Sequence, residues 1–178
     1  MFKKDLGNGF EIKEISSEEL ESFLAKHFDE LFSNRIENAV PSPRASNGKL
    51  VARKKEWKKF SLRLGVFYQD QMIGWHYGQA SDFETYYMQN SAILPEYRSQ
   101  GLYGKLLSVV LEKVRDEEFQ VVTSLHHPNN AAVLIPKLKA GFVITGMQFH
   151  ERFRSLVELR YIFDWERREA FCRGVGFL

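Results

Sequence analysis

A stretch in the middle of the chain combines an apolar strand pattern, a proline and two closely spaced glycines. The β-prone run 86–94 stops at Pro95, and Gly101 and Gly104 then bracket the start of an amphipathic helix pattern. One face of that helix carries apolar residues at helical spacing: Leu102, Leu106, Val109, Val110 and Val114. A joint of this kind aims unpaired backbone N–H groups and the positive end of the helix dipole at one point. Phosphate binds at such a point, and glycine lets a diphosphate approach the backbone closely.

The glycine spacing alone is unspecific, because it matches neither the Walker pattern nor the dinucleotide fingerprint. The neighbouring residues sharpen it. The segment Pro95-Glu-Tyr-Arg-Ser-Gln-Gly101 is followed downstream by Asn129-Asn-Ala-Ala132, which leads to Lys139-Ala-Gly-Phe142. Together these segments resemble the GNAT superfamily of acetyl-coenzyme A-dependent N-acetyltransferases, and the resemblance covers about residues 60–163.

The resemblance implies an α+β fold: a GNAT-like mixed, mostly antiparallel central sheet with helices on both faces. It also implies acetyl-CoA as the acyl donor substrate, with no metal. The residues that match the family's coenzyme-binding segments are Ile93, Arg98, Ser99, Gln100, Gly101, Leu102, Tyr103, Gly104, Lys105 and Asn130. Among them, Ile93 maps to the position whose backbone N–H stabilises the developing oxyanion of the thioester.

The chain departs from the family pattern at three points. Tyr103 stands where the family usually has Gly or Ala, so its side chain must turn away from a bound diphosphate. Pro136 interrupts the helix that Asn130 opens and should kink or delay it. The position of the tyrosine that protonates the departing thiolate is held by Pro136 or Lys137, so that general acid is not carried over.

Acetyl transfer to an amine requires a base, because an amine with a pKa of about 10.4 is protonated at neutral pH and cannot attack. The candidates are His126, His127, Glu84 and Tyr87. The two histidines follow the predicted strand 120–125 and titrate near neutral pH. Glu84 would act through a water molecule, and Tyr87 occupies a position where some family members carry a glutamate. His76 is a further candidate, and for each of these residues a structural role is the competing interpretation.

Two functions fit these residues. The first is an N-acetyltransferase that moves an acetyl group to a primary amine of a small molecule or peptide, by direct attack in a ternary complex. The second is a non-catalytic acyl-CoA-binding or sensing module, which the absent tyrosine and the absent carboxylate at Tyr87 would suit. Release of free thiol from acetyl-CoA across an amine library separates the two. Nucleic-acid binding is not expected, because the basic run 44–59 carries almost no base-stacking aromatic residues.

The composition is that of one domain spanning residues 1–178, with 44% hydrophobic residues and a net charge of +2. Residues 38–59 form an irregular basic segment, either a solvated face or a possible flap over the site. Cys172 is the single cysteine, which suits a reducing compartment. Neither a targeting segment nor an apolar span is evident, so a cytoplasmic protein without membrane contact is expected. The oligomeric state is left open, with a homodimer among the options.

The elements that must position these residues follow from periodicity and punctuation. Ser16 and Glu19 form a capping-box pattern before an amphipathic helix. The expected strands are 10–15, 60–68, 71–79, 85–94, 120–125, 142–150 and 156–164, and the expected helices after the first are 102–118, 131–139 and 165–171. Strands in antiparallel runs followed by two strand-helix-strand crossovers predict an α+β sheet domain.

Overall fold

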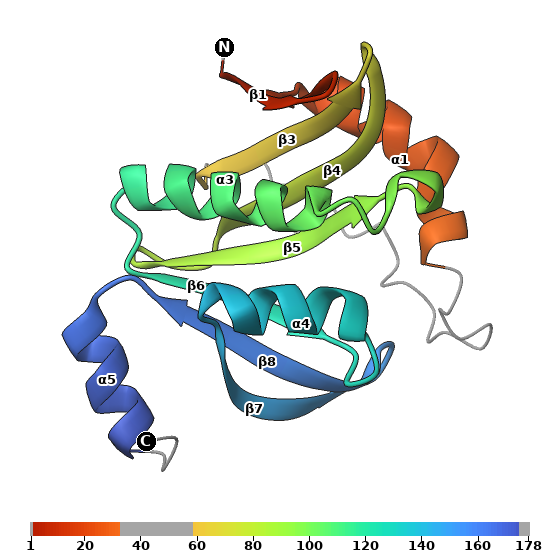
Figure 1. Cartoon of the computed structure of the whole chain (residues 1–178). Helices are drawn as coiled ribbons and strands as arrows, with labels where there is room; N and C mark the ends of the chain where they lie inside the picture. Colours follow the sequence, from red (N-terminus) through yellow and green to blue (C-terminus); the bar gives the residue numbers. More distant parts are fainter. Residues whose placement is uncertain (1, 33–58, 175–178) are drawn as a thin grey trace, which may run out of the picture.

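The computed structural model describes residues 2–32 and 59–174. The predictions for residues 38–58, including a flap, lie outside the described residues. One eight-stranded sheet runs through the described part, in the order β1-β2-β3-β4-β5-β6-β8-β7 (Figure 1). The strands are β1 (Lys3–Gly7), β2 (Phe10–Glu14), β3 (Ser61–Tyr68), β4 (Gln71–Ala80), β5 (Thr85–Ile93), β6 (Val121–His126), β7 (Val143–His150) and β8 (Arg154–Ile162).

The first half of the sheet is an antiparallel run. β1 to β5 pair antiparallel in chain order, and Gln69 and Asp70 make the β3–β4 turn with φ of 47° and 67°. Two consecutive residues with positive φ give a turn whose twist matches that of the flanking strands. α1 (Ser17–Leu31) follows β2 in the chain. Its predicted capping box is present, with Ser16 Oγ accepting from the Glu19 N–H at 3.1 Å.

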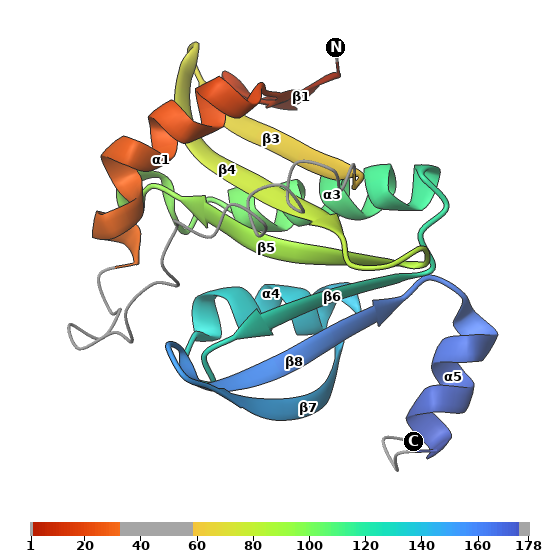
Figure 2. The ribbon, with the colours of Figure 1, turned by 180° about the vertical axis from the view of Figure 1, so that it is seen from behind.

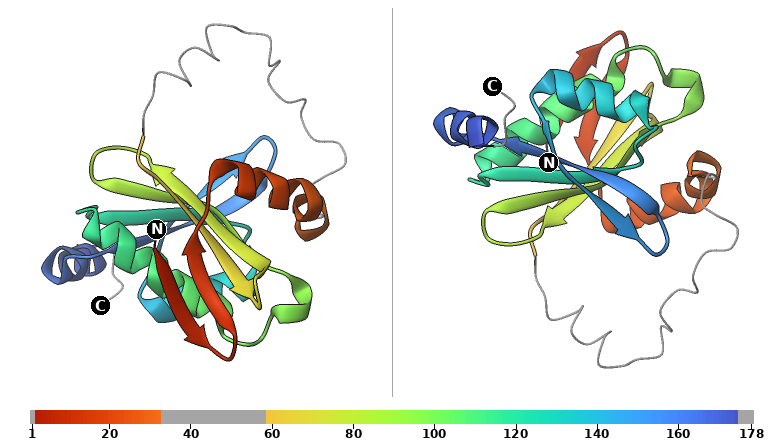
Figure 3. Two further views of the ribbon diagram at one scale, coloured as in Figure 1. Left: turned by 90° about the horizontal axis from the view of Figure 1, so that it is seen from above. Right: turned by 90° about the horizontal axis from the view of Figure 1, so that it is seen from below.

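The second half contains two crossovers. β5 leads through the short 3-10 helix η1 (Pro95–Tyr97) into α3 (Leu102–Asp116) and then β6. β6 leads through α4 (Ala131–Ala140) into β7, and α5 (Trp165–Gly174) follows β8. α3 and α4 cover one face of the sheet and α1 covers the other (Figures 1 and 2). Figure 3 shows the same layers from above and below, with α5 beside the sheet.

The core lies between the sheet and its helices. All five apolar residues predicted for the inner face of α3 are buried. On the other face, Phe23 of α1 and Phe32, the C-cap residue of that helix, pack edge-on against the fully buried Trp75. Even-numbered residues of β4 such as His76 therefore face α3 and α4, because side chains alternate along a strand.

The predicted fold class is confirmed: the sheet is mixed and mostly antiparallel, with helices on both faces. Two details differ from the expectations. β1 was not predicted, because its sequence Lys-Lys-Asp-Leu-Gly is mostly polar and it is an edge strand with only β2 beside it. α4 runs on through Pro136, which removes the N–H that would have bonded to the carbonyl of Ala132.

Candidate active site

The backbone between β5 and α3 turns through two left-handed residues. Ser99 has a φ of 62° and Gly101 a φ of 73°, and Gly101 is the N-cap of α3 with no side-chain cap. The first N–H groups of α3 are therefore not satisfied by a capping side chain, and they point with the positive end of the helix dipole into the space before the helix. We call residues 94–104 the glycine loop.

The glycine loop has room for an anion. A Cβ built on Gly101 or on Gly104 would meet no heavy atom within 4 Å, and Ser99 and Gln100 are exposed. The side chain of Tyr103 packs against the hydrophobic core, and its burial raises the pKa of the hydroxyl. The bulky residue is thus turned away from the space that a diphosphate would occupy.

Three other side chains in the loop or directly after it are engaged in the fold itself. Arg98 Nε donates to the carbonyl of Ile93 at 2.9 Å, and Lys105 Nζ donates to the carbonyl of Leu6 at 3.0 Å. Leu102 is buried in the core. These contacts fasten the loop to the end of β5 and to the β1–β2 hairpin, so the loop's means of holding an anion is chiefly its backbone.

β5 and β6 form a short parallel ladder and then separate. Their paired residues run only from Thr85↔Val121 to Tyr87↔Thr123, although both strands continue, and Figure 1 shows them diverging toward the glycine loop. Beyond the last pair, β5 carries a bulge: Gln89 is the extra residue between the pairs Tyr77↔Asn90 and Gly78↔Met88. We call the point just beyond Tyr87 and Thr123 the strand fork.

The register aims the N–H of Ile93 into the opening between the two strands. The N–H of Leu94 donates to the carbonyl of Ile73 on β4 at 2.8 Å. Hydrogen-bonded and non-hydrogen-bonded pairs alternate along antiparallel strands, and Ile93 pairs with Gly74 as the next residue along. The N–H of Ile93 therefore points away from β4 and toward β6, as an oxyanion donor in the opening would require.

Lys137 reaches from α4 to the strand fork. Its Nζ donates to Ser124 Oγ at 2.7 Å and lies 3.4 Å from Met88 Sδ. Met88 and Ser124 directly follow the last paired residues of β5 and β6. Lys137 is 1% exposed, and burial lowers its pKa from 10.5 to about 7. The sequence left open which of Pro136 and Lys137 stands at the position of the absent tyrosine, and of the two it is Lys137 whose side chain reaches the strand fork.

Two histidines lie near this lysine on the same face of the sheet. His76 is fully buried and hydrogen-bonds through Nδ1 to Ser91 Oγ at 2.7 Å and through Nε2 to Tyr86 Oη at 2.8 Å. The half-buried His126 hydrogen-bonds through Nε2 to Ser124 Oγ at 3.1 Å. Burial, with a smaller effect from the charge of Lys137, lowers the pKa of each imidazole to about 3. Both rings are therefore neutral at pH 7.

A comparison with protein families gives a match to the acetyltransferase (GNAT) family over residues 16–142. This range includes β5, the glycine loop, the strand fork and α4. The chain belongs to the GNAT family of acetyltransferases. The resemblance inferred from the glycine loop and the Asn130 segment is thereby confirmed, while no curated protein matches the chain by sequence.

Solved structures with the same fold include other acetyltransferases. The protein yncA from Salmonella typhimurium, solved with its cofactor acetyl-CoA, has a TM-score of 0.64 at 15% identity, covering 89% of this chain and 96% of its own. A ribosomal-protein-alanine N-acetyltransferase from Escherichia coli has a TM-score of 0.62 at 15% identity, covering 87% and 94%. A ribosomal-protein-alanine acetyltransferase from Vibrio fischeri has a TM-score of 0.66 at 12% identity, covering 93% and 98%. The TM-scores show that these proteins share the fold of this chain.

The carboxylate predicted as a base in this GNAT protein lies away from the glycine loop. Glu84 precedes β5 at the end opposite Ile93, and both of its carboxylate oxygens accept from Arg167 of α5 at 3.1 Å. This ion pair lowers the pKa of Glu84. The structure therefore does not bring Glu84 together with the other site residues.

Tyr87, His127 and Asn130 lie closer to the opening. Tyr87 is the last β5 residue paired with β6, it is half-buried, and burial raises its pKa. His127 directly follows β6 and is exposed. Asn130 is the N-cap of α4, but its side chain makes no cap hydrogen bond. The Asn130 amide is therefore not used to cap α4.

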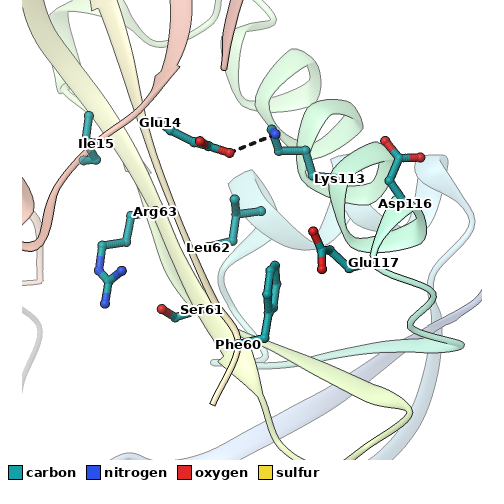
Figure 4. Close-up of a pocket in the computed structure, with 9 residues that line it drawn as sticks. All are labelled: Glu14, Ile15, Phe60, Ser61, Leu62, Arg63, Lys113, Asp116 and Glu117. Carbon is teal, nitrogen blue, oxygen red and sulfur yellow. Dashed lines mark ion pairs between the residues drawn. The ribbon is translucent and has the colours of Figure 1, made fainter. Parts of the chain in front are cut away.

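One cavity among the described residues lies away from the glycine loop. It measures about 290 Å³ and lies between β3 and the C-terminal end of α3, where an ion pair of 2.9 Å joins Lys113 and Glu14 (Figure 4). Its lining residues are Glu14, Ile15, Phe60, Ser61, Leu62, Arg63, Lys113, Asp116 and Glu117. They include none of the predicted site residues, and three are carboxylates, so this cavity does not suit a diphosphate.

The described residues also bear on metals and membranes. Within residues 2–32 and 59–174 there is no group of three or more His, Cys, Asp or Glu side chains placed to hold a metal ion. None of the helices in the described ranges combines the length and apolar character that crossing a bilayer requires.

Proposed function

We propose that this GNAT protein transfers an acetyl group from acetyl-CoA to a primary amine of a small molecule or peptide by direct attack in a ternary complex. The observation that carries the proposal is the junction of three features at one end of β5: the uncapped start of α3, the open space at Gly101 and Gly104, and the divergence of β5 from β6. An anion site beside an opening lined by free strand edges suits a ligand with a diphosphate at one end and an extended arm.

The acyl donor would use these features in order along its length. Backbone N–H groups of residues 99–105 would hold the diphosphate, because an uncapped helix start favours negative charge. The extended arm would lie between β5 and β6, with the Asn130 amide as a hydrogen-bond partner at the start of α4. The thioester carbonyl would then accept from the N–H of Ile93, which points into the opening.

The acceptor amine must reach the thioester from the side that α3 and α4 leave open. Tyr87 pairs with Gln79 and Thr123, so it lies at the strand fork on the face of the sheet that carries α1. An amine arriving there would approach the thioester carbon from the face opposite Lys137. We infer that this α1 side receives the acceptor.

The amine proton is best passed to a water molecule near Tyr87. Glu84 is held by Arg167 at the far end of β5, and an imidazole with a pKa of about 3 makes His126 a weak base. The hydroxyl of Tyr87 is protonated at neutral pH because burial raises its pKa, so it can orient a water but not itself accept the proton. His127 is the exposed alternative at the end of β6.

Thiol release tests this function. The protein is mixed with acetyl-CoA and a panel of primary amines and peptides with free amino termini, and binding of acetyl-CoA is measured separately by calorimetry. Binding with amine-dependent thiol release supports the proposal. Binding without turnover for any amine would identify a non-catalytic acyl-CoA-binding module, and absent binding would refute both functions.

The variants His127→Gln and Tyr87→Phe then identify the base. A positioned base is typically worth about 10²–10⁴-fold in rate. If His127→Gln keeps its turnover and Tyr87→Phe does not, the water-mediated route is supported. A loss of about 10²-fold or more in His127→Gln alone would replace it with direct proton transfer to that imidazole.

A further inference from the structure

Burying Lys137 at its position in the fold costs free energy. A lysine is almost never fully buried unless it is paired, and within the described residues no carboxylate forms an ion pair with Lys137. Its partners are the Ser124 hydroxyl, the Met88 sulfur and the face of the Phe142 ring, whose centroid lies 5.0 Å from Nζ. A hydroxyl, a thioether and an aromatic ring only partly replace water around an ammonium group.

The Lys137 amine also lies at a distinct place in the fold. The side chain ends at the strand fork, where Nζ contacts Met88 of β5 and Ser124 of β6. These two residues directly follow the last pair of the β5–β6 ladder. From this point the two strands diverge toward the glycine loop (Figure 1). A thioester lying in the opening with its carbonyl toward Ile93 would have its sulfur on the α4 side, facing Nζ.

A hydrogen-bonded path connects the buried amine with a less buried group. Ser124 Oγ is shared by Lys137 Nζ at 2.7 Å and His126 Nε2 at 3.1 Å. His126 is half-buried at the end of β6, and exposed His127 is next in the chain. A proton can therefore pass from solvent to His126, from His126 to Ser124, and from Ser124 to Lys137.

We propose that Lys137 is the proton donor to the coenzyme A sulfur, and that Ser124 and His126 return the proton to it from solvent. This inference rests on the proposed acetyl transfer. The amine nitrogen forms a bond to the carbonyl carbon and later loses one proton to water. The C–S bond breaks, its electron pair goes to sulfur, and a proton of the Lys137 ammonium joins that sulfur. The neutral Nζ then accepts the Ser124 hydroxyl proton, and Ser124 takes the Nε2 proton of His126. His126 takes a proton back from solvent, to which the amine proton was released.

The surroundings of Lys137 favour the loss of its proton. Burial disfavours the positive charge of Lys137. The imidazoles of His76 on β4 and of His126 on β6 are neutral, so they supply no negative charge that would offset it. A pKa of about 7 makes the ammonium a stronger acid than a thiol with a pKa of about 8.5, so proton transfer to the sulfur is favourable. The groups around Nζ are His76 from β4, Met88 from β5, and Ser124 and His126 from β6. None of these described residues is a carboxylate.

Coenzyme A itself is the first probe, because it needs no acceptor. Its thiol is titrated by thiolate ultraviolet absorption while bound to the parent protein, to Lys137→Met and to the control Lys139→Met. Lys139 is an exposed lysine on the same helix. Lys137 has lost its charge in the pH range where the thiol ionises, but its Nζ–H can still donate a hydrogen bond to the sulfur, which favours the thiolate. The thiolate should therefore appear about one pH unit lower in the parent and the control than in Lys137→Met. Identical titrations in all three proteins would overturn the inference.

Turnover with an amine from the thiol-release panel is the second measurement. Lys137→Met should lose about 10²-fold or more in turnover while binding acetyl-CoA as the parent does. The falling limb of turnover at high pH, where Lys137 loses its proton, should vanish in this variant. Ser124→Ala should slow turnover without changing the thiol titration, and an unchanged rate would remove the return path from the proposal.

Three further outcomes separate the possible failures. A parent protein that binds no coenzyme A refutes the proposed function first. Normal turnover in Lys137→Met with parent binding refutes only the donor role. Acetylation of Lys137 itself, detected by intact-mass analysis of the parent after incubation with acetyl-CoA, would make it a nucleophile instead and would equally overturn the inference.

Discussion

The glycine loop and the strand fork are the two ends of one candidate site, and they are built from different parts of the protein. The glycine loop acts through its backbone: the left-handed Gly101, the uncapped helix start and the open space beside Gly104. The strand fork acts through side chains, with Lys137 from α4, Ser124 from β6 and Met88 from β5 meeting at one point. Backbone geometry suits the recognition of a fixed anion, whereas a network of side chains suits the handling of protons.

This difference predicts that the two regions fail differently. Changes in the glycine loop should weaken binding of the coenzyme, and changes at the strand fork should alter proton chemistry and its pH dependence. The predictions below test that division, beginning with the largest expected effect.

The strand fork should show its largest effect in stability as a function of pH. Lys137 has a pKa of about 7 in the folded protein against 10.5 for the ordinary side chain. Between these values the unfolded chain holds a proton that the folded chain has lost, so stability rises with pH. The cost of the buried charge is fully present below about pH 7 and is relieved toward pH 10.5.

Lys137→Met should remove this pH dependence. Relative to the variant, the parent should gain up to about 1.4 kcal/mol in unfolding free energy for each pH unit across that window. Denaturant unfolding at pH 7, 8 and 9 measures the difference, with Lys139→Met as the control. A parent and a Lys137→Met variant whose stabilities run parallel with pH would show that Lys137 keeps its ordinary pKa.

In the glycine loop, Gly101→Val should weaken acetyl-CoA binding at least tenfold, about 1.4 kcal/mol. The variant places a branched side chain where a diphosphate would approach, and a left-handed φ of 73° also costs an L-residue about 1–2 kcal/mol. Calorimetry measures the affinity.

Gly9→Val separates the two causes. Gly9 has a φ of 79° and lies in the β1–β2 hairpin, where a Cβ would make only ordinary contacts. Both variants should therefore lose stability, but only Gly101→Val should lose affinity. An equal affinity in the two would remove the diphosphate from the glycine loop.

Asn130→Ala should have a smaller effect, confined to binding. One hydrogen bond between neutral groups is worth about 0.5–1.5 kcal/mol, and the Asn130 side chain makes no cap bond in α4, so the melting temperature should not change. Asn129→Ala is the matched control from the exposed neighbour. If Asn129→Ala weakens acetyl-CoA binding and Asn130→Ala does not, the ligand contact belongs to Asn129.

Glu84→Gln should have the smallest effect of these variants. It removes a surface ion pair with Arg167 at the end of β5 that lies away from the opening. Turnover should therefore fall by much less than the roughly 10²-fold that removal of a base typically causes. A loss of that size in steady-state kinetics would make Glu84 the base, at the end of β5 that pairs with β6. It would contradict the division of roles between the glycine loop and the strand fork.

The sequence predicted the glycine loop well because its signals are local. Pro95 ends a strand, Gly101 permits a conformation that other residues adopt at a cost, and the apolar spacing of residues 102–114 decides which face of α3 is buried. A bound diphosphate also required the bulky Tyr103 to turn away from it, and the residue packs with the core. Each of these features depends on a few neighbouring residues.

The strand fork could not be predicted in this way. From the sequence, Lys137 was only one of two residues that could stand at the position of the missing tyrosine. No sequence pattern indicated that Ser124 and Met88 would be its partners. The pattern of α4 also hid the buried position, because a lysine beside a proline looks like a solvent-facing residue. Glu84 was a reasonable candidate by type, but its partner Arg167 is 83 positions away.

The sequence by itself determined the fold class, the glycine loop and the family, because periodicity, turn residues and helix starts act over short distances along the chain. Only the tertiary structure decided which titratable groups meet. It placed one lysine at the point where two strands part, since pairing between β5 and β6 ends at Tyr87 and Thr123. The pKa of that lysine is set by the water that folding excludes from around it, and burial of this kind is a property of the assembled sheet and helices.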